Sequence, residues 1–344
     1  MRLLFLACLS PKTGNCTTAE RIRSHIEAAG HTCILHNSAD IKDRSDVTDL
    51  AMQDPQFEAA LAIHLYKGGR FLLDIHVPVG IVFGGTDVNE DVKDESKRAV
   101  MERVLKKARF AVAFTPQMKE NAESFLLSES SKIRVQPQGI ETRAASDFSW
   151  RGFLRSSGVE ADHVDDLCVF LLVCGLRRVK DPLYLLKAFS EWHASNPQVV
   201  FIIIGPKMDP ELSEEVEERV RRSSGVYLTA EREQDELHAA MTHSFALVNS
   251  SISEGMSAAI LEAMHLGLPV LARDIPGNAA IVEHEGTGLL YSSPEEFILL
   301  AKRLLDDRLL QKQLSENGMR YVGERHSFAQ ERKTYQQLVE TLHL

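Results

Sequence analysis

The stretch SEGMSAAILEAMHLGLPVLARDIPGNAA, residues 253–280, places one glutamate directly before a predicted helix and a second inside it. Ser257 is a suitable N-cap for this helix. An apolar stripe at helical spacing follows, formed by Ile260, Leu261, Met264 and Leu268. LPVLARD, residues 268–274, then has the continuous apolar run of a strand that is buried on both faces. A loop, a helix and a buried strand in this order are typical of a doubly wound α/β sheet.

The two glutamates, Glu254 and Glu262, are candidates for contact with a ligand. Glu262 lies off the apolar stripe and next to Ala258 and Ala259, whose small side chains let a ligand approach the helix closely. Free backbone N–H groups at the start of the helix favour an anion or a ligand rich in hydroxyl groups. The alternative is that Glu262 is a solvated helix residue and Glu254 a turn residue.

The same alternation extends over nearly the whole chain of 344 residues. Apolar runs of strand length occur at residues 3–9, 32–35, 59–65, 78–83, 110–114 and 133–135, and helical patterns, such as 19–29, fill most of the gaps. Between residues 139 and 166 the alternation pauses in a segment rich in Ser, Gly and charge, which predicts a linker. It resumes with CVFLLVCG and a helix at 182–194. We therefore predict two doubly wound α/β domains, 1–150 and 151–327.

Composition limits the functions and compartments that are possible. The net charge of −10 argues against a protein that mainly binds nucleic acid or an anionic membrane, and no apolar run reaches the length of a transmembrane helix. Five cysteines without CxxC spacing predict a reducing compartment, the cytoplasm. The start MRLLFLACLSP also resembles a short signal peptide, which would make the protein secreted. We favour a first strand, because the residues that follow fit a fold.

Cations follow the first predicted strand of the second domain, at the edge where doubly wound sheets bind their ligands. CGLRRVKDP places Arg177 and Lys180 there, and cations at this edge suit a diphosphate. Gly14 and Asn15 hold the matching place in the first domain, where a glycine before a helix permits close approach of a phosphate. Solvated loop residues and an ordinary glycine turn are the alternatives.

Two further candidates follow strands of the first domain. His64 ends the strand LAIHL, and Asp87 lies in the glycine-rich turn FGGTDVNED. Either residue could contact a sugar or handle a proton. The alternatives are a structural histidine and an aspartate that only hydrogen-bonds its own backbone.

Together these motifs resemble the retaining glycosyltransferases of family 4, the glycosyl transferases group 1 domain. NSSISEGMSAAILEAMHLGLPVLARDIPGN resembles the E-x7-E signature of that family, and CGLRRVKDPLYLLKAF its Arg/Lys loop and following helix. VQPQGIE resembles the end of its first domain and FGGTDVNED its acceptor-side turn. The resemblance implies the GT-B fold, in which two Rossmann-like domains face each other across a cleft that holds the active site. It also implies that a C-terminal helix, 328–344, joins the first, acceptor-side domain.

The resemblance further implies a role for each matching residue. Glu262 would bind the ribose hydroxyl groups of a nucleoside-diphosphate sugar, and Glu254 would bind the sugar that is transferred. Arg177 and Lys180 would stabilise the diphosphate leaving group, with neither a metal ion nor a cofactor. The catalytic set is then Glu254, Arg177, Lys180, Asp87 and His64. Further donor contacts are expected from Gly14, Asn15, Gly205, Gly255, Met256, Ser257, Ala258 and Ala259.

Three features depart from the family pattern. Gly84 and Gly85 stand where the family often has His-Gly, so an acceptor-side histidine contact is lost or moved to His64. The Arg177–Lys180 spacing is shorter than the common form, and Gly14-Asn15 replaces a frequent Gly-Gly pair.

We predict retaining transfer from a nucleoside-diphosphate sugar to an unidentified acceptor. A UDP-sugar is favoured as the donor, with residues 230–233 near the base. The alternatives are a non-catalytic nucleotide-sugar scaffold or sensor, and a GT-B relative that isomerises or phosphorolyses its substrate.

Overall fold

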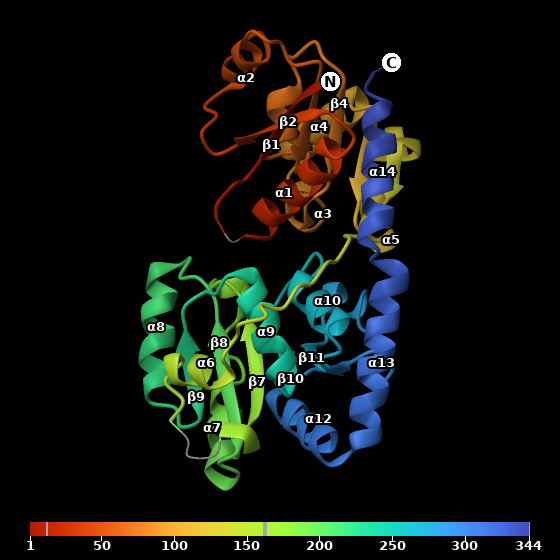
Figure 1. Cartoon of the computed structure of the whole chain (residues 1–344). Coiled ribbons are helices and arrows are strands. Elements are labelled where there is room, and N and C mark those ends of the chain that lie inside the picture. The colour runs from red at the N-terminus through yellow and green to blue at the C-terminus, as the bar shows by residue number, and fades with distance from the viewer. Residues whose placement is uncertain (12, 161–163, 344) are drawn as a thin grey trace. The chain divides into compact units, whose positions relative to one another are not determined.

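A computed structural model of the chain describes residues 1–11, 13–160 and 164–343 (Figure 1). The chain divides into two compact units: unit 1 is Met1–Gly139 with His326–Leu344, and unit 2 is Ile140–Arg325. Each unit holds one six-stranded sheet in which neighbouring strands are parallel. The first division falls earlier than the expected boundary at residue 150.

Unit 1 has the strand order β2-β1-β3-β4-β5-β6. Its strands are β1 (Arg2–Ala7), β2 (Thr32–Asn37), β3 (Ala59–Ile63), β4 (Val79–Val82), β5 (Phe110–Ala113) and β6 (Ile133–Val135). Its α-helices are α1 (Gly14–Glu27), α2 (Arg44–Ala51), α3 (Gly85–Asn89), α4 (Glu95–Lys107), α5 (Pro116–Phe125) and α14 (Phe328–Glu340). The 3-10 segments are η1 (Gly69–Leu72), η2 (Asp91–Lys93) and η3 (Leu127–Lys132). The order of the strands reverses between β1 and β3, which makes this point the place where a doubly wound sheet binds its ligand.

The apolar start of the chain forms an interior strand. β1 pairs with β2 on one side and with β3 on the other, and residues Leu3–Ala7 are fully buried. The sequence-predicted first strand is therefore present.

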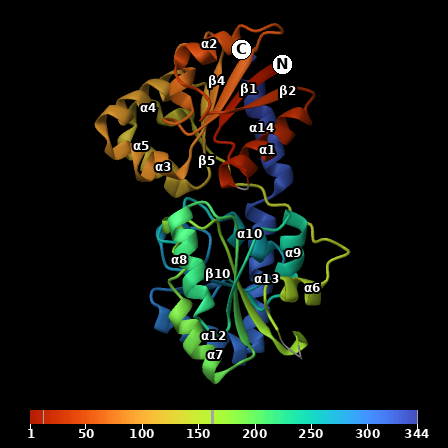
Figure 2. The ribbon, with the colours of Figure 1, turned by 90° about the vertical axis from the view of Figure 1, so that its left-hand side faces the viewer.

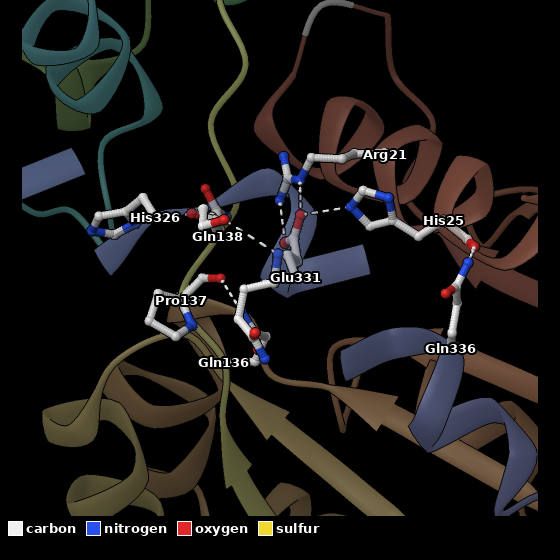
Figure 3. Close-up of polar contacts among 10 residues, drawn as sticks. Arg21, His25, Gln136, Pro137, Gln138, His326, Glu331 and Gln336 are labelled. Carbon is white, nitrogen blue, oxygen red and sulfur yellow. Dashed lines mark hydrogen bonds and ion pairs between the residues drawn. The ribbon is translucent and has the colours of Figure 1, made fainter. Parts of the chain in front are cut away.

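The C-terminal helix α14 belongs to unit 1 and packs on α1 (Figures 1 and 2). Glu331, in its first turn, is fully buried between the two helices. Its carboxylate accepts hydrogen bonds from Arg21 Nε at 2.9 Å and Nη2 at 3.3 Å, and it lies 2.8 Å from Nε2 of His25 (Figure 3). Because both partners lie on α1, this ion cluster fastens the last helix of the chain to the first.

The same cluster holds the segment that leaves β6. A Cβ atom on Gly139 would lie 2.7 Å from Oε2 of Glu331 and 2.8 Å from Cα of Phe328, so only glycine permits this close approach. His326 Nδ1 lies 2.9 Å from the carbonyl oxygen of Gln138 (Figure 3). The two places where the chain passes between unit 1 and unit 2 are therefore joined by a hydrogen bond on the unit 1 side.

Unit 2 has the strand order β12-β11-β10-β7-β8-β9. Its strands are β7 (Cys168–Val173), β8 (Val199–Ile204), β9 (Val226–Thr229), β10 (Ala246–Asn249), β11 (Val270–Arg273) and β12 (Leu289–Tyr291). Its helices are α6 (Trp150–Ser156), α7 (Leu186–Ser195), α8 (Pro210–Arg221), α9 (Gln234–His243), α10 (Ala258–His265), α11 (Pro276–Ala279), α12 (Pro294–Asp306) and α13 (Arg308–Arg325), with the 3-10 segments η4 (Val164–Asp166) and η5 (Arg178–Lys180). This is the strand order of dinucleotide-binding Rossmann sheets, and its switch point lies between β7 and β10.

Residues of β7 alternate between two apolar cores, one on each face of the sheet. Val169 and Leu171 belong to the core under α6, α9 and α10, whereas Phe170 and Leu172 belong to the core under α7, α8 and α12. Figure 2 shows α8 and α9 on opposite sides of the sheet. Successive side chains of a strand point to opposite faces, so a strand that is covered on both sides is apolar throughout.

Several local predictions were wrong. Segment 139–166 is not only a linker, because it contains α6, whose Phe153 and Leu154 enter the unit 2 core; a helix of this length places too few side chains in the core to show periodicity. FGGTDVNED forms the short helix α3 and not only a turn. The helix expected at 182–194 begins at Leu186, after a turn in which Asp181 is left-handed, with φ 44°.

Candidate active site

The switch point of unit 2 brings Lys180 and Glu254 together. Nζ of Lys180 lies 2.5 Å from Oε1 of Glu254, and the two side chains are only 16% and 8% exposed. Lys180 lies on the loop after β7 and Glu254 on the loop after β10. The backbone N–H of Ile252 donates to the carbonyl oxygen of Val179 at 2.9 Å, which joins the same two loops. Two of the sequence-predicted residues therefore form one nearly buried ion pair.

The carboxylate of Glu254 is held through one of its oxygens. Oε1 also accepts hydrogen bonds from Oγ of Ser251 at 2.7 Å and from Nδ2 of Asn249 at 3.3 Å. Oε2 accepts no hydrogen bond from any residue that the structure describes. The anchored oxygen therefore fixes the group in place, and the other oxygen is left for a ligand.

The cations of the Lys180 loop differ in their surroundings. Arg178 is 66% exposed and pairs with Asp209 and Glu211 of the α8 segment. Arg177, which was predicted to contact the ligand, is exposed at the start of the same turn. Lys180 alone of the three meets Glu254.

Arg273, at the end of β11, links the loop that carries Lys180 to the loop that carries Glu254. Its Nη1 donates to Oδ2 of Asp181 at 3.0 Å and to the carbonyl oxygen of Ser250 at 3.2 Å. Its guanidinium carbon lies 3.9 Å from the ring centroid of Tyr184. No role was predicted for Arg273 from the sequence, although a cation at the end of a buried strand was a usable signal.

Glu262 lies on α10, as expected, and its side chain is 15% exposed. Its Oε2 lies 3.7 Å from Nε2 of His238, a buried residue of α9 that sequence analysis also missed. Nδ1 of His238 lies 3.1 Å from the backbone nitrogen of Arg143. Glu262 is therefore not a fully solvated helix residue.

The start of α10 is partly exposed around a buried Ser257. Ser257 occupies the N-cap position, but its side chain makes no capping hydrogen bond. Backbone N–H groups in the first helical turn have no partner within the helix, and they attract negative charge. Gly255, Met256, Ala258 and Ala259 line this end and are partly exposed.

Gly277, in α11, lies directly against the backbone of Glu254. A Cβ atom at this position would lie 2.1 Å from the carbonyl oxygen of Glu254 and 2.9 Å from its Cβ. Within residues 253–280, the turn at Gly277 therefore supports the backbone of Glu254.

A cavity of about 860 Å³ lies along β9 and α8 in unit 2. At the carboxyl edge of the sheet its lining includes Leu176, Gly205, Thr229, Ala230 and Glu231. A Cβ on Gly205 would lie 1.9 Å from the carbonyl oxygen of Cys174, so this glycine is needed for packing as well as for the shape of the cavity. Burial raises the pKa of the Cys174 thiol to about 12, which keeps it protonated at neutral pH.

The switch point of unit 1 brings Asn15 and His64 together. Nδ2 of Asn15 lies 3.1 Å from Nε2 of His64, so this orientation of the amide makes Nε2 the acceptor. The ring proton is then on Nδ1, which lies 3.2 Å from Oγ1 of Thr86 and 3.5 Å from Oδ2 of Asp87. His64 has a φ of 70°, a left-handed conformation that is uncommon outside glycine and costs free energy.

Asp87 is fully buried and serves the His64 segment. Its carboxylate accepts hydrogen bonds from the backbone N–H groups of Leu65 and Gly84, each at 2.9 Å, and of Tyr66 at 3.3 Å. Because the side chain of Asp87 has no exposed surface, its expected direct contact with a sugar is not supported.

Packing requires glycine at position 84 but not at position 14. A Cβ on Gly84 would lie 1.8 Å from Cε1 of His64, so the imidazole ring fills the space that a side chain at position 84 would take. A Cβ on Gly14, the first residue of α1, would meet no described atom within 4 Å, and its φ is not positive. Neither packing nor backbone conformation within the described residues thus requires glycine at position 14.

No group of three or more His, Cys, Asp or Glu side chains that could hold a metal ion occurs among residues 1–11, 13–160 and 164–343. In the same part of the chain, no helix has both the length and the apolar character needed to cross a membrane.

Comparison with known proteins identifies the family. Residues 160–321 match the family described as glycosyl transferases group 1. Glycosyltransferase 1 domain-containing protein 1 of Xenopus tropicalis is 52% identical over 341 residues, which cover 98% of this chain and 97% of that protein. The Escherichia coli UDP-Gal:alpha-D-GlcNAc-diphosphoundecaprenol alpha-1,3-galactosyltransferase is 28% identical over 193 residues, 54% of this chain and 48% of that protein.

Solved structures share the fold over nearly the full length. Anabaena Alr3699/HepE in complex with UDP and glucose matches with a TM-score of 0.79 at 17% identity, covering 99% of both chains. WaaG, a glycosyltransferase involved in lipopolysaccharide biosynthesis, matches with a TM-score of 0.74 at 16% identity, covering 98% of this chain and 99% of that one. The chain therefore belongs to the glycosyl transferases group 1 family and is a glycosyltransferase with the GT-B fold.

Proposed function

We propose that the protein transfers a sugar, with retention of anomeric configuration and without a metal ion, from a UDP-sugar to an acceptor that is not yet identified. The observation that carries this proposal is the Lys180–Glu254 pair at the switch point of unit 2. It places a cation, and a carboxylate with hydrogen-bond partners on only one of its oxygens, at the edge where a doubly wound sheet binds its ligands.

In the proposed reaction the acceptor attacks from the side on which the diphosphate leaves. The bond between the anomeric carbon and the diphosphate oxygen breaks, and a bond from that carbon to the acceptor oxygen forms on the same face. The acceptor proton passes to the departing diphosphate. Negative charge grows on that diphosphate, where Lys180 and Arg177 stabilise it, while Oε2 of Glu254 binds a hydroxyl group of the sugar. No nucleophile from the protein is needed.

The donor side is proposed to use the rest of the unit 2 edge. Glu262 accepts the ribose hydroxyl protons, and the uncapped start of α10 receives phosphate or sugar oxygens. The part of the cavity lined by Thr229, Ala230 and Glu231 holds the base. UDP is favoured because HepE shares the fold and was solved with UDP and with UDP-glucose, and because the E. coli relative is named for UDP-Gal.

The acceptor side is proposed to use His64 and Asn15 of unit 1. The ring of His64 occupies the space in front of Gly84, which supports a histidine contact that has moved along the chain. Its left-handed backbone is a strain that a purely structural histidine does not need.

For the compartment, we propose the cytoplasm. The five cysteines carry free thiols, as expected in a reducing compartment.

The proposal is tested first by binding and then by turnover. UDP and UDP-sugars, but not GDP or ADP, are expected to raise the melting temperature in EDTA, since ligand at about 100 times its Kd adds about 2.7 kcal/mol. UDP release from the donor should also survive EDTA, and proton NMR of the product should show the anomeric configuration of the donor. Failure of every nucleotide to bind would contradict the proposal, and loss of turnover in EDTA would contradict metal independence.

Replacing Glu262 by alanine is expected to weaken UDP binding about 10- to 100-fold. The variant lacks the carboxylate that binds the ribose, and one hydrogen bond to a charged group is worth about 1.5–3 kcal/mol. Isothermal titration calorimetry with UDP measures the change. Glu316→Ala, an exposed glutamate on α13, is the matched control and should bind as the wild type does. Equal affinity of the two variants would remove Glu262 from the donor site.

Replacing Gly277 by alanine is expected to lower kcat at least 10-fold, because the added methyl group displaces the backbone of Glu254. Gly323→Ala is the control, since a Cβ there meets no atom within 4 Å and alanine favours the helix α13. Wild-type kcat in Gly277→Ala would show that the loop adapts and that the position of Glu254 is not critical.

A further inference from the structure

Asn278 is linked to Glu254 through Asn249, which forms a hydrogen bond with each of them. Asn278 belongs to α11 and is fully buried. Its Nδ2 donates to the carbonyl oxygen of Arg273 and to Oδ1 of Asn249, each at 2.9 Å. We propose that Asn278 is a positioning residue that sets the orientation of Asn249 and thereby holds Glu254 against the donor sugar, an inference that rests on the proposed function.

The polarity of this chain of hydrogen bonds runs in one direction only. The carbonyl oxygen of Arg273 can only accept, so Asn278 must turn its NH₂ group towards it and towards Asn249. Asn249 must therefore present Oδ1, which also accepts from the backbone N–H of Ser251 at 3.1 Å. Nδ2 of Asn249 then faces Oε1 of Glu254, at 3.3 Å. An amide turned the other way would place one oxygen against another.

The backbone around Asn249 is also held in place. The hydroxyl group of Tyr291, a fully buried residue of β12, donates to the carbonyl oxygen of Asn249 at 2.7 Å. Gly277, the residue before Asn278, packs against the backbone of Glu254. Two successive residues of α11 thus support the Glu254 loop, one through packing and one through its amide.

Asn278 also lowers the stability of the folded state through one unpaired polar atom. Its Oδ1 is buried, and no described residue donates a hydrogen bond to it. Buried polar atoms without partners destabilise the folded state. A smaller residue would remove this unpaired atom, so the presence of asparagine fits a role in the site better than a role in stability.

The experiment compares Asn278→Ser and Asn278→Asp with the wild type in three measurements. These are the Kd of UDP, the ratio of the Kd of UDP to that of the UDP-sugar, and kcat. Serine breaks the link to Asn249 without adding charge, whereas aspartate offers only acceptors and turns the amide of Asn249 over. Asn317→Ser is the matched control, because Asn317 lies on α13 and its Nδ2 donates to the carbonyl oxygen of Gly286, outside this chain of hydrogen bonds.

Both variants are expected to keep the Kd of UDP within about twofold. The UDP-sugar is expected to lose the affinity that it has beyond that of UDP. The kcat is expected to fall about 10-fold for serine and about 100-fold for aspartate, since a misplacement of 1 Å near a reacting centre can lower the rate this much. Loss of kcat and of UDP affinity in the same proportion would show a purely structural role and overturn the inference. So would wild-type values for both variants.

Asn249→Ser is the second variant, and it covers the case in which a change at Asn278 prevents folding. It breaks the same chain at its middle member and is expected to show the same separation of UDP affinity from kcat. Wild-type sugar discrimination and kcat in this variant would overturn the inference. Failure of the wild-type protein to bind UDP would instead defeat the proposed function, and the inference with it.

Discussion

Replacing Lys180 by alanine is expected to lower kcat for sugar transfer about 100- to 1,000-fold, the usual effect of removing one preorganised group that stabilises developing charge. The ammonium group of Lys180, on the loop after β7, lies 2.5 Å from Oε1 of Glu254 and is largely shielded from water. In such surroundings its charge acts strongly on a leaving diphosphate. Steady-state release of UDP measures the change, and the Kd of UDP is expected to change much less than kcat.

Two further variants separate the possible roles of Lys180. Arg178→Ala removes a cation two residues away whose partners are Asp209 and Glu211, and it should leave kcat near the wild-type value. The double variant Lys180→Ala, Glu254→Gln tests whether Lys180 only neutralises Glu254. Recovery of kcat in the double variant would contradict a role for Lys180 in stabilising the leaving group.

Replacing Glu331 by glutamine is expected to destabilise unit 1 by about 3 kcal/mol. The change removes the carboxylate that compensates the charge of Arg21 and that is the hydrogen-bond partner of His25, and removal of one partner from a buried ion pair typically costs about 3–5 kcal/mol. Both tryptophans, Trp150 and Trp192, lie in unit 2, so their fluorescence follows that unit during urea unfolding. Circular dichroism follows both units, and it should show the earlier transition.

The exposed glutamate of the same helix provides the control. Glu340 is 60% exposed and lies 3.2 Å from His31, so Glu340→Gln should leave both transitions nearly unchanged. An equal shift of the tryptophan transition in Glu331→Gln, or no shift by either probe, would show that the cluster does not fasten α14 to unit 1.

Acid provides a second test of the Glu331 cluster. Burial by itself would raise the pKa of Glu331, but His25, Arg21 and the backbone of Gly139 outweigh it and hold the pKa below the usual glutamate value of 4.5. A carboxyl group whose pKa is lowered on folding stabilises the protein above the unfolded pKa, and this stability is lost as the pH falls through the folded pKa. Unit 1 should therefore lose stability below about pH 4.5, with a weaker dependence in Glu331→Gln.

The sequence by itself determined the fold class and singled out the residues that are candidates for the site. Continuous apolar strands alternate with amphipathic helices, and this pattern depends only on the local periods of strand and helix. Parallel strands end at one edge of the sheet, so residues that follow strands, such as Lys180 and Glu254, were predictable candidates. Element boundaries were less predictable: α1 begins at Gly14 and not at residue 19, because its first turn carries mainly polar residues.

Only the tertiary structure decided which side chains meet. Lys180 and Glu254 are 74 residues apart in the chain, and Arg21 and Glu331 are 310 apart. The order of strands in the sheet and the packing of α14 on α1 bring them together, and neither leaves a local signal. The structure likewise shows that Asp87, a possible ligand contact by sequence, is buried and supports the segment that carries His64. It also revealed Asn278, whose role depends on the direction of hydrogen bonds that a linear sequence does not contain.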